Sequence, residues 1–350
     1  MDNQNIMVPK SEKAFVIAEI GHNHQGSIKI AREMMKSAKD VGVDAVKFQK
    51  RDNKSLFTKK LYDQPYENEN SYGRTYGEHR EALEFGKSEY IELQDYAKEL
   101  DIMLFATPFD FKSVEFLADL NMPAYKIASA DLSNTPLQKE IAKLKKPIYL
   151  STGGGTISDI RRACEAILPL NDQLYIMHCT ASYPTKIEDM NLNVIQNLIR
   201  EFPSQIIGLS DHENGIDAAS IAFMLGARVF EKHFTLNRAW KGTDQSFSLE
   251  PEGLRKLVRN LNRINIMRGS GEKHLLECEE APLKKMAKSI VAAKYLSAGH
   301  VINDTDIAFK SPSGGLPPYE YRNVIGMILH ESVNEDQHIL FENLIPNNVK

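Results

Sequence analysis

Two histidines in the segment 208–244, His212 and His233, have the spacing of a pair of metal ligands. Each follows a short apolar run, and a helix-like segment lies between the two runs. If the runs are neighbouring parallel strands, which lie about 4.8 Å apart, both imidazoles emerge at the same end of a sheet. Two imidazoles with open positions suit a catalytic divalent ion completed by substrate oxygens and water. A polar cluster without metal is the alternative, and His22 and His24 are competing ligands.

Two lysines, Lys47 and Lys126, lie inside mostly apolar runs, where a charged side chain is costly unless it is paired. Together with several hydroxyl-bearing residues and the glycines at 153–155, they predict a site for an oxyanion, most simply a phosphate. Lysine supplies point charge, hydroxyls and backbone N–H groups supply directional hydrogen bonds, and glycine permits close approach. A tight turn explains the glycines about equally well. The lysines alternatively pair with carboxylates, for which the candidates are Glu19, Asp131 and Glu231.

Eight strand-like runs, each followed by a helical pattern, would bring these side chains together. Short β-rich runs that alternate with amphipathic segments indicate βαβ units and a parallel sheet. Eight such pairs in about 255 residues have the usual size of a closed (β/α)8 TIM barrel, the fold class that we predict. An open doubly wound sheet is the alternative, although no GxGxxG motif follows the first run. The predicted strands are Phe15–Glu19, Ala45–Phe48, Met103–Ala106, Tyr125–Ile127, Ile148–Ser151, Leu174–His178, Ile206–Ser210 and Val229–His233.

The helical partners show one apolar face at a spacing of three and four residues. Ser88 and Ser158 are predicted N-caps. One long connection, residues 51–87, follows the second strand, and a connection of this length is more often functional than idle, for example as a lid or a dimer contact. We expect His79 within it to be a surface residue. The predicted helices are Ser27–Val41, Ser88–Leu100, Lys112–Leu120, Ser158–Ile167, Leu192–Phe202, Ile216–Leu225 and Glu252–Met267.

Polar side chains follow every predicted strand, at the edge where the active site of a parallel barrel lies. Ser210 and His212 share strand parity, as do Glu231 and His233, so all four can point inward. Random surface polarity would not be sorted in this way, because the strand interiors are apolar. The full set is Glu19, His22, Lys47, Gln49, Thr107, Lys126, Ser129, Asp131, Ser151, residues 178–183, Ser210, His212, Glu231 and His233.

Composition predicts a globular protein that binds neither nucleic acid nor membrane. The chain of 350 residues has a formal net charge of −4 and 42% hydrophobic residues, so there is no basic footprint for nucleic acid. No apolar run approaches the roughly 20 residues that span a bilayer, and the N-terminal MDNQNIMVPKSEK lacks the apolar region of a signal peptide. Three scattered cysteines argue for reduced thiols in a cytoplasmic protein. We expect Cys179 to be a small buried residue in preference to a nucleophile.

The pattern changes near the end of the last predicted helix. Residues 1–270 are predicted to form the barrel, which carries the site, and residues 271–287 are polar and turn-rich, as expected of a linker. Residues 288–350 consist of short strand-like runs punctuated by glycine and proline, which predicts a small β-rich domain. Because so small a domain is marginally stable alone, we expect it to dock against something else.

Ten motifs occur in order along nearly the whole chain. They are IAEIGHNHQG (17–26), DAVKFQ (44–49), TYGEHREALEF (75–85), ATPFD (106–110), PAYKIAS (123–129), LSTGG (150–154), HCTASYPT (178–185), GLSDHENG (208–215), FEKHFTL (230–236) and KGTDQSFSLEP (241–251). This series resembles the sialic acid synthase family, the phosphoenolpyruvate-condensing N-acylneuraminate synthases. The C-terminal domain resembles the antifreeze-like (SAF, β-clip) cap of the same family.

The resemblance implies a metal-dependent condensation of phosphoenolpyruvate with N-acetylmannosamine or its 6-phosphate, which gives N-acetylneuraminate or its 9-phosphate and phosphate. It implies that His212 and His233 hold Mn²⁺ or Mg²⁺, and that Glu19 and Asp131 are the acidic catalytic residues. The implied phosphoenolpyruvate contacts are Lys47, Thr107, Lys126, Ser129, Ser151 and Ser210. The implied contacts with the N-acyl hexosamine are Gln49, Tyr183 and Asp244.

In the implied mechanism the metal polarises the sugar aldehyde, which C3 of phosphoenolpyruvate attacks. Water then adds at C2, with Asp131 or Glu19 as the base, and phosphate leaves by C–O cleavage. A homodimer is also implied, in which each cap covers the partner's active site. Two positions depart from bacterial members of the family: Ala181 stands in place of an asparagine, and Ser311 in place of an arginine that reaches the N-acyl group from the partner's cap.

Three alternatives stay open at this point. The same condensation could use a different amino sugar and give legionaminic or pseudaminic acid. The barrel could instead isomerise or cleave a sugar with a metal and without phosphoenolpyruvate. An ice-binding or carbohydrate-binding protein with a vestigial barrel is the third, and the complete set of polar strand ends argues against it.

Overall fold

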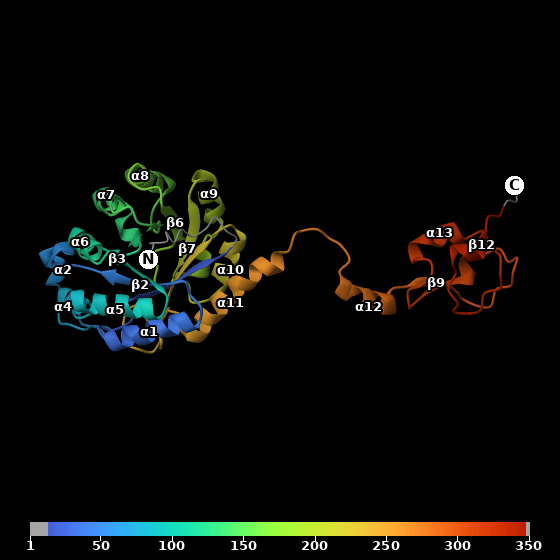
Figure 1. The fold of residues 1–350 in the computed structure, drawn as a ribbon, viewed down its shortest axis with the longest axis horizontal. Coiled ribbons are helices and arrows are strands. Elements are labelled where there is room, and N and C mark those ends of the chain that lie inside the picture. The colour runs from blue at the N-terminus through green and yellow to red at the C-terminus, as the bar shows by residue number, and fades with distance from the viewer. Residues whose placement is uncertain (1–12, 348–350) are drawn as a thin grey trace. The chain divides into compact units, whose positions relative to one another are not determined.

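The computed structural model describes residues 13–347, and the chain divides into two compact units, Met1–Gly269 and Ser270–Lys350 (Figure 1). Residues 1–12 and 348–350 lie outside the described residues. The prediction that the N-terminal segment is not a signal peptide concerns mainly residues 1–12, so the structure does not bear on it. Among residues 13–347, no helix combines the length and the apolarity that crossing a bilayer requires.

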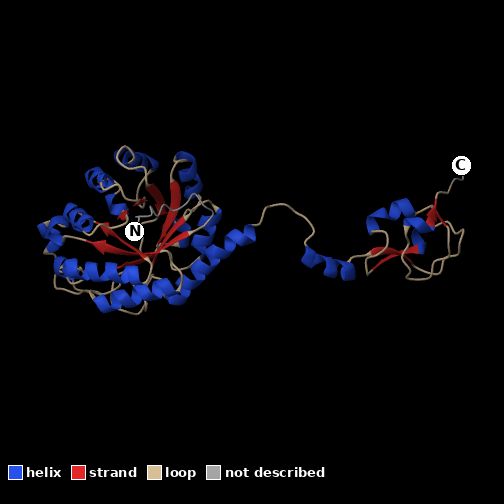
Figure 2. Cartoon of the chain, viewed as in Figure 1, coloured by secondary structure: helices blue, strands red, loops and turns tan. Residues whose placement is uncertain are grey.

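A closed barrel of eight parallel strands forms the first unit, which confirms the predicted fold. The order of the strands follows the chain, and β1 pairs with both β2 and β8 to close the barrel. Figure 2 shows the strands surrounded by helices. The strands are β1 (Phe15–Gly21), β2 (Ala45–Lys50), β3 (Met103–Pro108), β4 (Tyr125–Ile127), β5 (Ile148–Ser151), β6 (Leu174–Cys179), β7 (Ile206–Asp211) and β8 (Val229–His233).

The helices around the barrel match the predicted ranges, but two predicted N-caps are wrong. Helix α8 begins after Thr156, whose side chain accepts a hydrogen bond from Asp159 N, and α5 begins after Gly86. Ser158 and Ser88 lie two residues beyond these caps, inside the first helical turn. Helix α7 is absent from the predicted ranges. The helices are α1 (Ile28–Asp40), α5 (Lys87–Glu99), α6 (Phe111–Asp119), α7 (Thr135–Lys143), α8 (Ile157–Ile167), α9 (Val194–Glu201), α10 (Asp217–Met224) and α11 (Pro251–Arg268).

An apolar layer fills the barrel interior beneath the polar strand ends. Its members include Ile17, Ala45, Phe105, Tyr149 and Val229, all of them buried. Side chains two residues apart on a strand point to the same face. The residues two positions later on these strands therefore also point inward, at the end of the barrel where the strands finish. They are Glu19, Lys47, Thr107, Ser151 and Glu231.

The long connection 51–87 contains three short helices, α2 (Asn53–Leu56), α3 (Lys59–Tyr62) and α4 (Tyr76–Glu81). It is tied to the loop after β8, because Tyr72 Oη donates to the Lys241 carbonyl at 2.8 Å and Gly242 N donates to Asn70 Oδ1 at 2.9 Å. His79 is buried, so the prediction of a surface position is wrong.

Aromatic packing explains the burial of His79. The rings of Tyr66 and Tyr72 lie 4.6 Å and 5.9 Å from its imidazole, and its Nδ1 accepts the Tyr72 N–H at 3.1 Å. A single histidine in a polar segment carries no periodic signal of burial, and only the path of the connection brings these tyrosines together.

The second unit is small and has its own apolar core, which includes Ile290, Ile302, Val324 and Ile339. Two antiparallel strand pairs support it, β9 (Ser289–Ala292) with β10 (Ile307–Lys310), and β11 (Ile328–Leu329) with β12 (Leu344–Ile345). A short helix, α13 (Tyr321–Val324), completes it.

Part of the predicted linker is a helix, α12 (Glu277–Met286). Acidic residues lie in its first turn and Lys284 and Lys285 in its last, which suits the helix dipole. It buries no residue, so it lacks the apolar face on which a helix prediction depends. Ser311 lies close to its end, where Ser311 Oγ donates to the Met286 carbonyl at 2.9 Å and accepts from Lys288 Nζ at 2.9 Å.

Candidate functional site

A cavity of about 620 Å³ lies at the C-terminal ends of the barrel strands, and its volume is typical of a ligand pocket. Of the residues to which the family resemblance assigns a role, all except Asp131 line it. Asp131 belongs to the short 3-10 helix Ser129–Asp131, where its Oδ1 accepts a hydrogen bond from Asn134 Nδ2 at 2.9 Å. The predicted residues in the wall are Glu19, Lys47, Gln49, Thr107, Lys126, Ser129, Ser151, Tyr183, Ser210, His212, His233 and Asp244.

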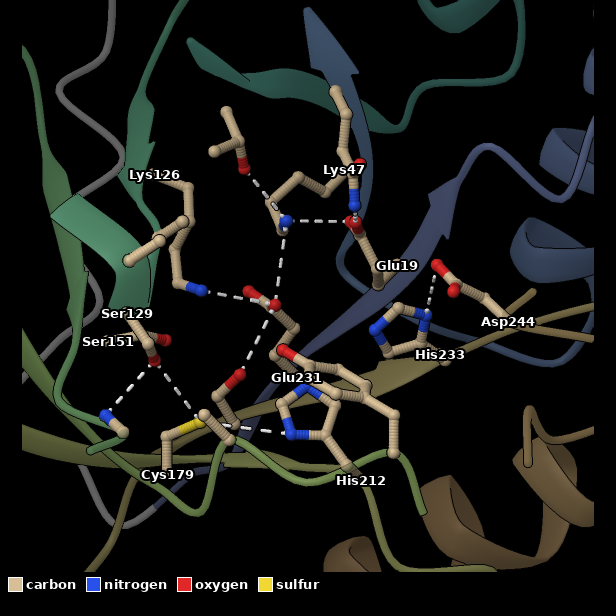
Figure 3. A pocket seen from close by; sticks show the side chains of 18 of the residues that line it. Glu19, Lys47, Lys126, Ser129, Ser151, Cys179, His212, Glu231, His233 and Asp244 are labelled. Carbon is tan, nitrogen blue, oxygen red and sulfur yellow. Dashed lines mark hydrogen bonds and ion pairs between the residues drawn. The ribbon is translucent and has the colours of Figure 1, made fainter. Parts of the chain in front are cut away.

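Glu231 is a counter-charge shared by two buried lysines (Figure 3). Its Oε1 lies 3.2 Å from Lys126 Nζ and 3.5 Å from Lys47 Nζ. Lys47 Nζ also pairs with Glu19 Oε2 at 2.7 Å and donates to Thr107 Oγ1 at 3.0 Å. The lysine–carboxylate pairing that stood as an alternative is therefore present, and the paired lysines still face the cavity. Two positive and two negative side chains make the network neutral.

The pKa values of the two lysines shift in opposite directions, and among the described residues Lys47 forms ion pairs with two carboxylates while Lys126 forms one. Burial lowers the pKa of Lys47, but attraction by Glu19 and Glu231 outweighs burial and raises it overall. Burial also lowers the pKa of Lys126, and together with the repulsion by Lys47 it outweighs the attraction by Glu231 and the weaker attraction by Glu19. An anionic ligand bound beside Lys126 would favour the charged form of its side chain.

The glycine turn after β5 comes close to Ser129. Gly153 N donates to Ser129 Oγ at 3.0 Å, and a Cβ atom on Gly153 would lie 2.7 Å from that oxygen and 2.9 Å from Ala181 Cβ. Gly154 has a φ of 73°, which favours glycine for the turn itself. Both explanations of the glycine run, close approach and tight turn, therefore apply.

Cys179 is buried beside this turn, as predicted. Its Sγ lies 3.5 Å from Ser129 Oγ and 3.8 Å from His212 Nδ1. Burial raises the pKa of the thiol, in opposition to the hydrogen bond from Ser129 and the charge of Lys126. A thiol with a raised pKa is a poor nucleophile.

The imidazoles of His212 and His233 are neighbours, with ring centroids 5.3 Å apart. His212 Nδ1 lies 3.1 Å from the Thr180 carbonyl oxygen, which can only accept, so Nδ1 carries the proton and Nε2 presents its lone pair. Burial, and next the neighbouring His233, lower the pKa of His212 to about 3, which keeps the ring neutral. His233 Nδ1 is buried without a hydrogen-bond partner among the described residues, and Asp244 Oδ2 is 3.8 Å away.

These two imidazoles fit a divalent ion, because one offers a lone pair and the other a buried nitrogen that lacks a hydrogen bond. Within residues 13–347, no group of three or more histidine, cysteine, aspartate or glutamate side chains is arranged to hold a metal ion. A pair of protein ligands leaves positions for water and substrate oxygens.

The competing histidines lie elsewhere. His22 Nε2 is 3.1 Å from Arg51 Nη1 and 3.3 Å from Glu84 Oε1, and the His24 ring stacks on Phe85 with centroids 4.0 Å apart. Burial lowers the pKa of both imidazoles. Neither histidine lines the cavity, whereas His212, which directly follows β7, and His233 at the end of β8 both do.

The residues expected on the sugar side surround the histidine pair. Gln49 Nε2 donates to Glu19 Oε1 at 2.7 Å. The Tyr183 ring lies 4.2 Å from that of His212, while more than half of the Tyr183 side chain stays exposed. Asp244 approaches His233 from the loop after β8 (Figure 3).

Two arginines in the cavity wall are absent from the predicted site. Arg51 directly follows β2, and Arg80 lies in α4. The sequence offered a separate signal for each, since Arg51 follows a predicted strand and Arg80 lies in the motif TYGEHREALEF. Strand periodicity does not extend into the connection 51–87, so only the folded path of that connection turns Arg80 toward the cavity.

Comparison with known proteins agrees with this geometry. The model of the NeuB family matches residues 34–273, and that of the SAF domain matches residues 287–345. The chain is 40% identical over 337 residues to the N-acetylneuraminate-9-phosphate synthase of Homo sapiens, covering 96% of this chain and 94% of that protein. It is 33% identical over 341 residues to the N,N'-diacetyllegionaminic acid synthase of Legionella pneumophila, covering 95% of each.

A solved structure shows the same architecture. The N-acetylneuraminic acid (sialic acid) synthetase from Leptospira borgpetersenii, crystallised in complex with citrate, superposes with a TM-score of 0.67 at 31% identity. The superposition covers 77% of this chain and 90% of the other. The expected resemblance is confirmed over both units: the chain belongs to the NeuB family and carries a SAF domain after its TIM barrel.

Proposed function

We propose that the protein condenses phosphoenolpyruvate with an N-acyl hexosamine, N-acetylmannosamine or its 6-phosphate, to give N-acetylneuraminate or its 9-phosphate and phosphate. One observation carries the proposal: a single cavity combines two lysines, a row of hydroxyls and a pair of adjacent histidines. The names of the similar proteins support it, since they are synthases of N-acetylneuraminate 9-phosphate and of a related acid.

Lys47 and Lys126 would hold the phosphate and carboxylate groups of phosphoenolpyruvate. The hydroxyls of Thr107, Ser151 and Ser210 lie in the same wall, and they would donate further hydrogen bonds in addition to those of the lysines. The remaining predicted contact, Ser129, is already oriented by Gly153 N. The main contribution of these residues would be to position the enol carbon for attack on the aldehyde.

His212 and His233 would hold Mn²⁺ or Mg²⁺. When bound there, the ion would supply Lewis-acid polarisation of a carbonyl oxygen. Tyr183 packs over His212 and would exclude water from this side of the cavity. Gln49 and Asp244 would orient the sugar hydroxyls through hydrogen bonds.

Glu19 is the better placed of the two expected bases. Its carboxylate faces the cavity, with Oε1 bonded to Gln49 and Oε2 paired with Lys47. Asp131 is not part of the wall. We infer that Glu19 accepts the proton of the water that adds at C2, and that Asp131 holds the 3-10 helix that carries Ser129.

Replacing Gly153 with alanine is expected to raise the KM for phosphoenolpyruvate about tenfold, the effect of losing roughly one hydrogen bond. The new Cβ would push on Ser129 Oγ and on the backbone of residue 181, which cannot move like a flexible side chain. Steady-state kinetics would measure the change. Gly154→Asn is the matched control, because no atom lies within 4 Å of a Cβ there and asparagine tolerates a positive φ. An unchanged KM in Gly153→Ala would contradict the assigned role of the turn.

The overall proposal is tested by supplying phosphoenolpyruvate and Mn²⁺ with a panel of hexosamines, one at a time. Phosphate release and product mass are measured. We expect phosphate release that requires both substrates, with a nine-carbon 2-keto acid as the product. A product derived from a diacetamido sugar would instead support the alternative synthesis of legionaminic or pseudaminic acid. Conversion of sugar without phosphoenolpyruvate would overturn the proposal in favour of isomerisation or aldol cleavage.

A further inference from the structure

Arg51 and Arg80 are positive side chains in the cavity wall that the proposed reaction does not use. The two lysines of the wall are matched by Glu19 and Glu231, so that part of the cavity is neutral. The arginines lie in another part of the wall, where Glu84 and Asp244 are carboxylates whose charge acts on them. Their contacts show what kind of ligand they could take.

Arg80 is held in place without an ion pair. Its Nε and Nη2 donate to Tyr76 Oη at 3.1 Å and 3.0 Å, and its Nη1 lies 3.4 Å from His22 Nδ1. Within residues 13–347, no carboxylate oxygen lies within 4.0 Å of its guanidinium. Tyr76 is itself packed against Phe57 and Tyr66, with ring centroids 5.1 Å and 5.4 Å away. Arg80 is therefore preorganised, with its charge unpaired.

Arg51 is buried and only weakly paired. Its guanidinium lies over the Phe109 ring at 3.8 Å, and its Nη2 donates to Gln49 Oε1 at 2.7 Å. Among the described residues, Glu84 is the carboxylate within 4.0 Å of it, at 3.9 Å, and Glu84 also accepts from Lys50 Nζ at 3.1 Å. Asp244 attracts it from farther away. Burial, and then the positive charge of Arg80, lower the pKa of Arg51 to about 10. The two guanidiniums therefore repel each other, and a bound anion would relieve that repulsion.

The arginines are linked to the residues expected to bind the sugar. Gln49 bridges them to the reacting end of the cavity, because its amide contacts both Arg51 and Glu19. Asp244 lies 3.8 Å from His233, and the positive charge of Arg80 contributes to the lowered pKa of its carboxyl group. A chain-like substrate with its aldehyde at the histidines and its hydroxyls at Gln49 and Asp244 would extend toward the two guanidiniums.

We propose that Arg51 and Arg80 form a second anion subsite, which binds a phosphate group on the end of the sugar remote from its aldehyde. This inference rests on the proposed function and narrows its substrate class to N-acyl hexosamine phosphates. Guanidinium groups suit the task, because their planar donors match phosphate oxygens in pairs. Two positive charges also balance the two negative charges of a phosphate monoester.

The test compares N-acetylmannosamine with its 6-phosphate in the full-length protein and in Arg80→Gln. We expect the unmodified protein to have the higher kcat/KM for the phosphorylated sugar. In Arg80→Gln the ratio of the two kcat/KM values should fall about 10- to 100-fold, the worth of a hydrogen bond to a charged group. The KM for phosphoenolpyruvate should not change. Arg80→Lys should restore part of the ratio, because it keeps the charge but not the paired donors.

The matched control is Arg74→Gln, an exposed arginine of the same connection whose side chain is outside the cavity wall. It should leave both kcat/KM values unchanged. Equal losses for the two sugars in Arg80→Gln, a higher KM for phosphoenolpyruvate, or no preference in the unmodified protein would each overturn the subsite. If neither sugar is condensed by any variant or by the unmodified protein, the proposed function itself fails, which is a distinguishable result.

Discussion

His212→Ala is expected to lower kcat about 10³-fold, the scale of losing a preorganised electrostatic contribution of several kcal/mol. The His212 side chain suits a neutral metal ligand. Its Nδ1 donates a hydrogen bond to the Thr180 carbonyl, and burial lowers the pKa of the ring to about 3. Alanine would leave His233 as the single imidazole at this place. A single imidazole binds a divalent ion only weakly. Residues 13–347 contain no group of three or more histidine, cysteine, aspartate or glutamate side chains that could hold the ion instead.

Two measurements separate this effect from unfolding. Mn²⁺ binding, followed by titration calorimetry, should be lost in His212→Ala, while the circular dichroism spectrum should stay unchanged. His274→Ala is the matched control, because His274 is exposed in the segment before α12. Full turnover together with unaltered Mn²⁺ binding in His212→Ala would exclude the histidine pair as the metal site. That result would also leave the open lone pair of Nε2 without an assigned role.

Glu231→Ala is expected to destabilise the barrel by about 3–5 kcal/mol, the usual cost of leaving a buried charge without its partner. Lys126 Nζ has Glu231 as its ion-pair partner, and Lys47 would keep only Glu19. Burial raises the pKa of Glu231, but attraction by the two lysines outweighs burial and lowers it overall, which favours the ionised carboxylate. Removing it would place an uncompensated ammonium in the interior.

Urea unfolding of the barrel, followed by tyrosine fluorescence, measures the loss. Adding Lys126→Met to Glu231→Ala should recover a substantial part of it, because the unpaired charge is then removed as well. Glu252→Gln is the surface control, since Glu252 and its partner Arg255 have exposed side chains on α11 and such pairs contribute little. Equal stability of Glu231→Ala and the unmodified protein would show that solvent reaches Lys126 and replaces the carboxylate.

The two variants probe different parts of the same wall. Glu231 makes it possible to keep two lysines in an apolar barrel, and His212 offers a neutral nitrogen a few ångströms away. Glu231→Ala is expected to lower the free energy of unfolding without loss of metal binding. His212→Ala is expected to abolish metal binding while the protein stays folded. These two different outcomes would show that the anion-binding and metal-binding parts of the wall contribute independently to stability and to metal binding.

Much of the barrel and of its site could be predicted from the amino-acid sequence alone. Strand periodicity is local, so the eight strands and their inward faces follow from residues two positions apart. Parallel strands end at one edge, and this brings Lys47, Lys126, Ser210 and His212 into one wall. The histidine pair was predictable for the same reason, since β7 and β8 are neighbours in the chain and in the barrel.

Other features depend on the tertiary structure because they arise from loops and long-range contacts. Glu231 acts as a shared counter-charge only because β8 faces β2 and β4 across the barrel interior. Arg80 reaches the cavity, and His79 is buried, through the folded path of the connection 51–87. Asp131 follows a strand like the other predicted residues, but the 3-10 helix after β4 keeps it out of the wall.

Residue types and strand spacing by themselves determined which end of the barrel carries the chemistry and which side chains could meet there, since both follow from local periodicity. The histidines at 212 and 233 were identified in this way. Only the tertiary structure decided how the charges there are balanced and which loop residues join the wall. Ion pairing and loop paths depend on distances between residues far apart in sequence, and no local pattern encodes those distances.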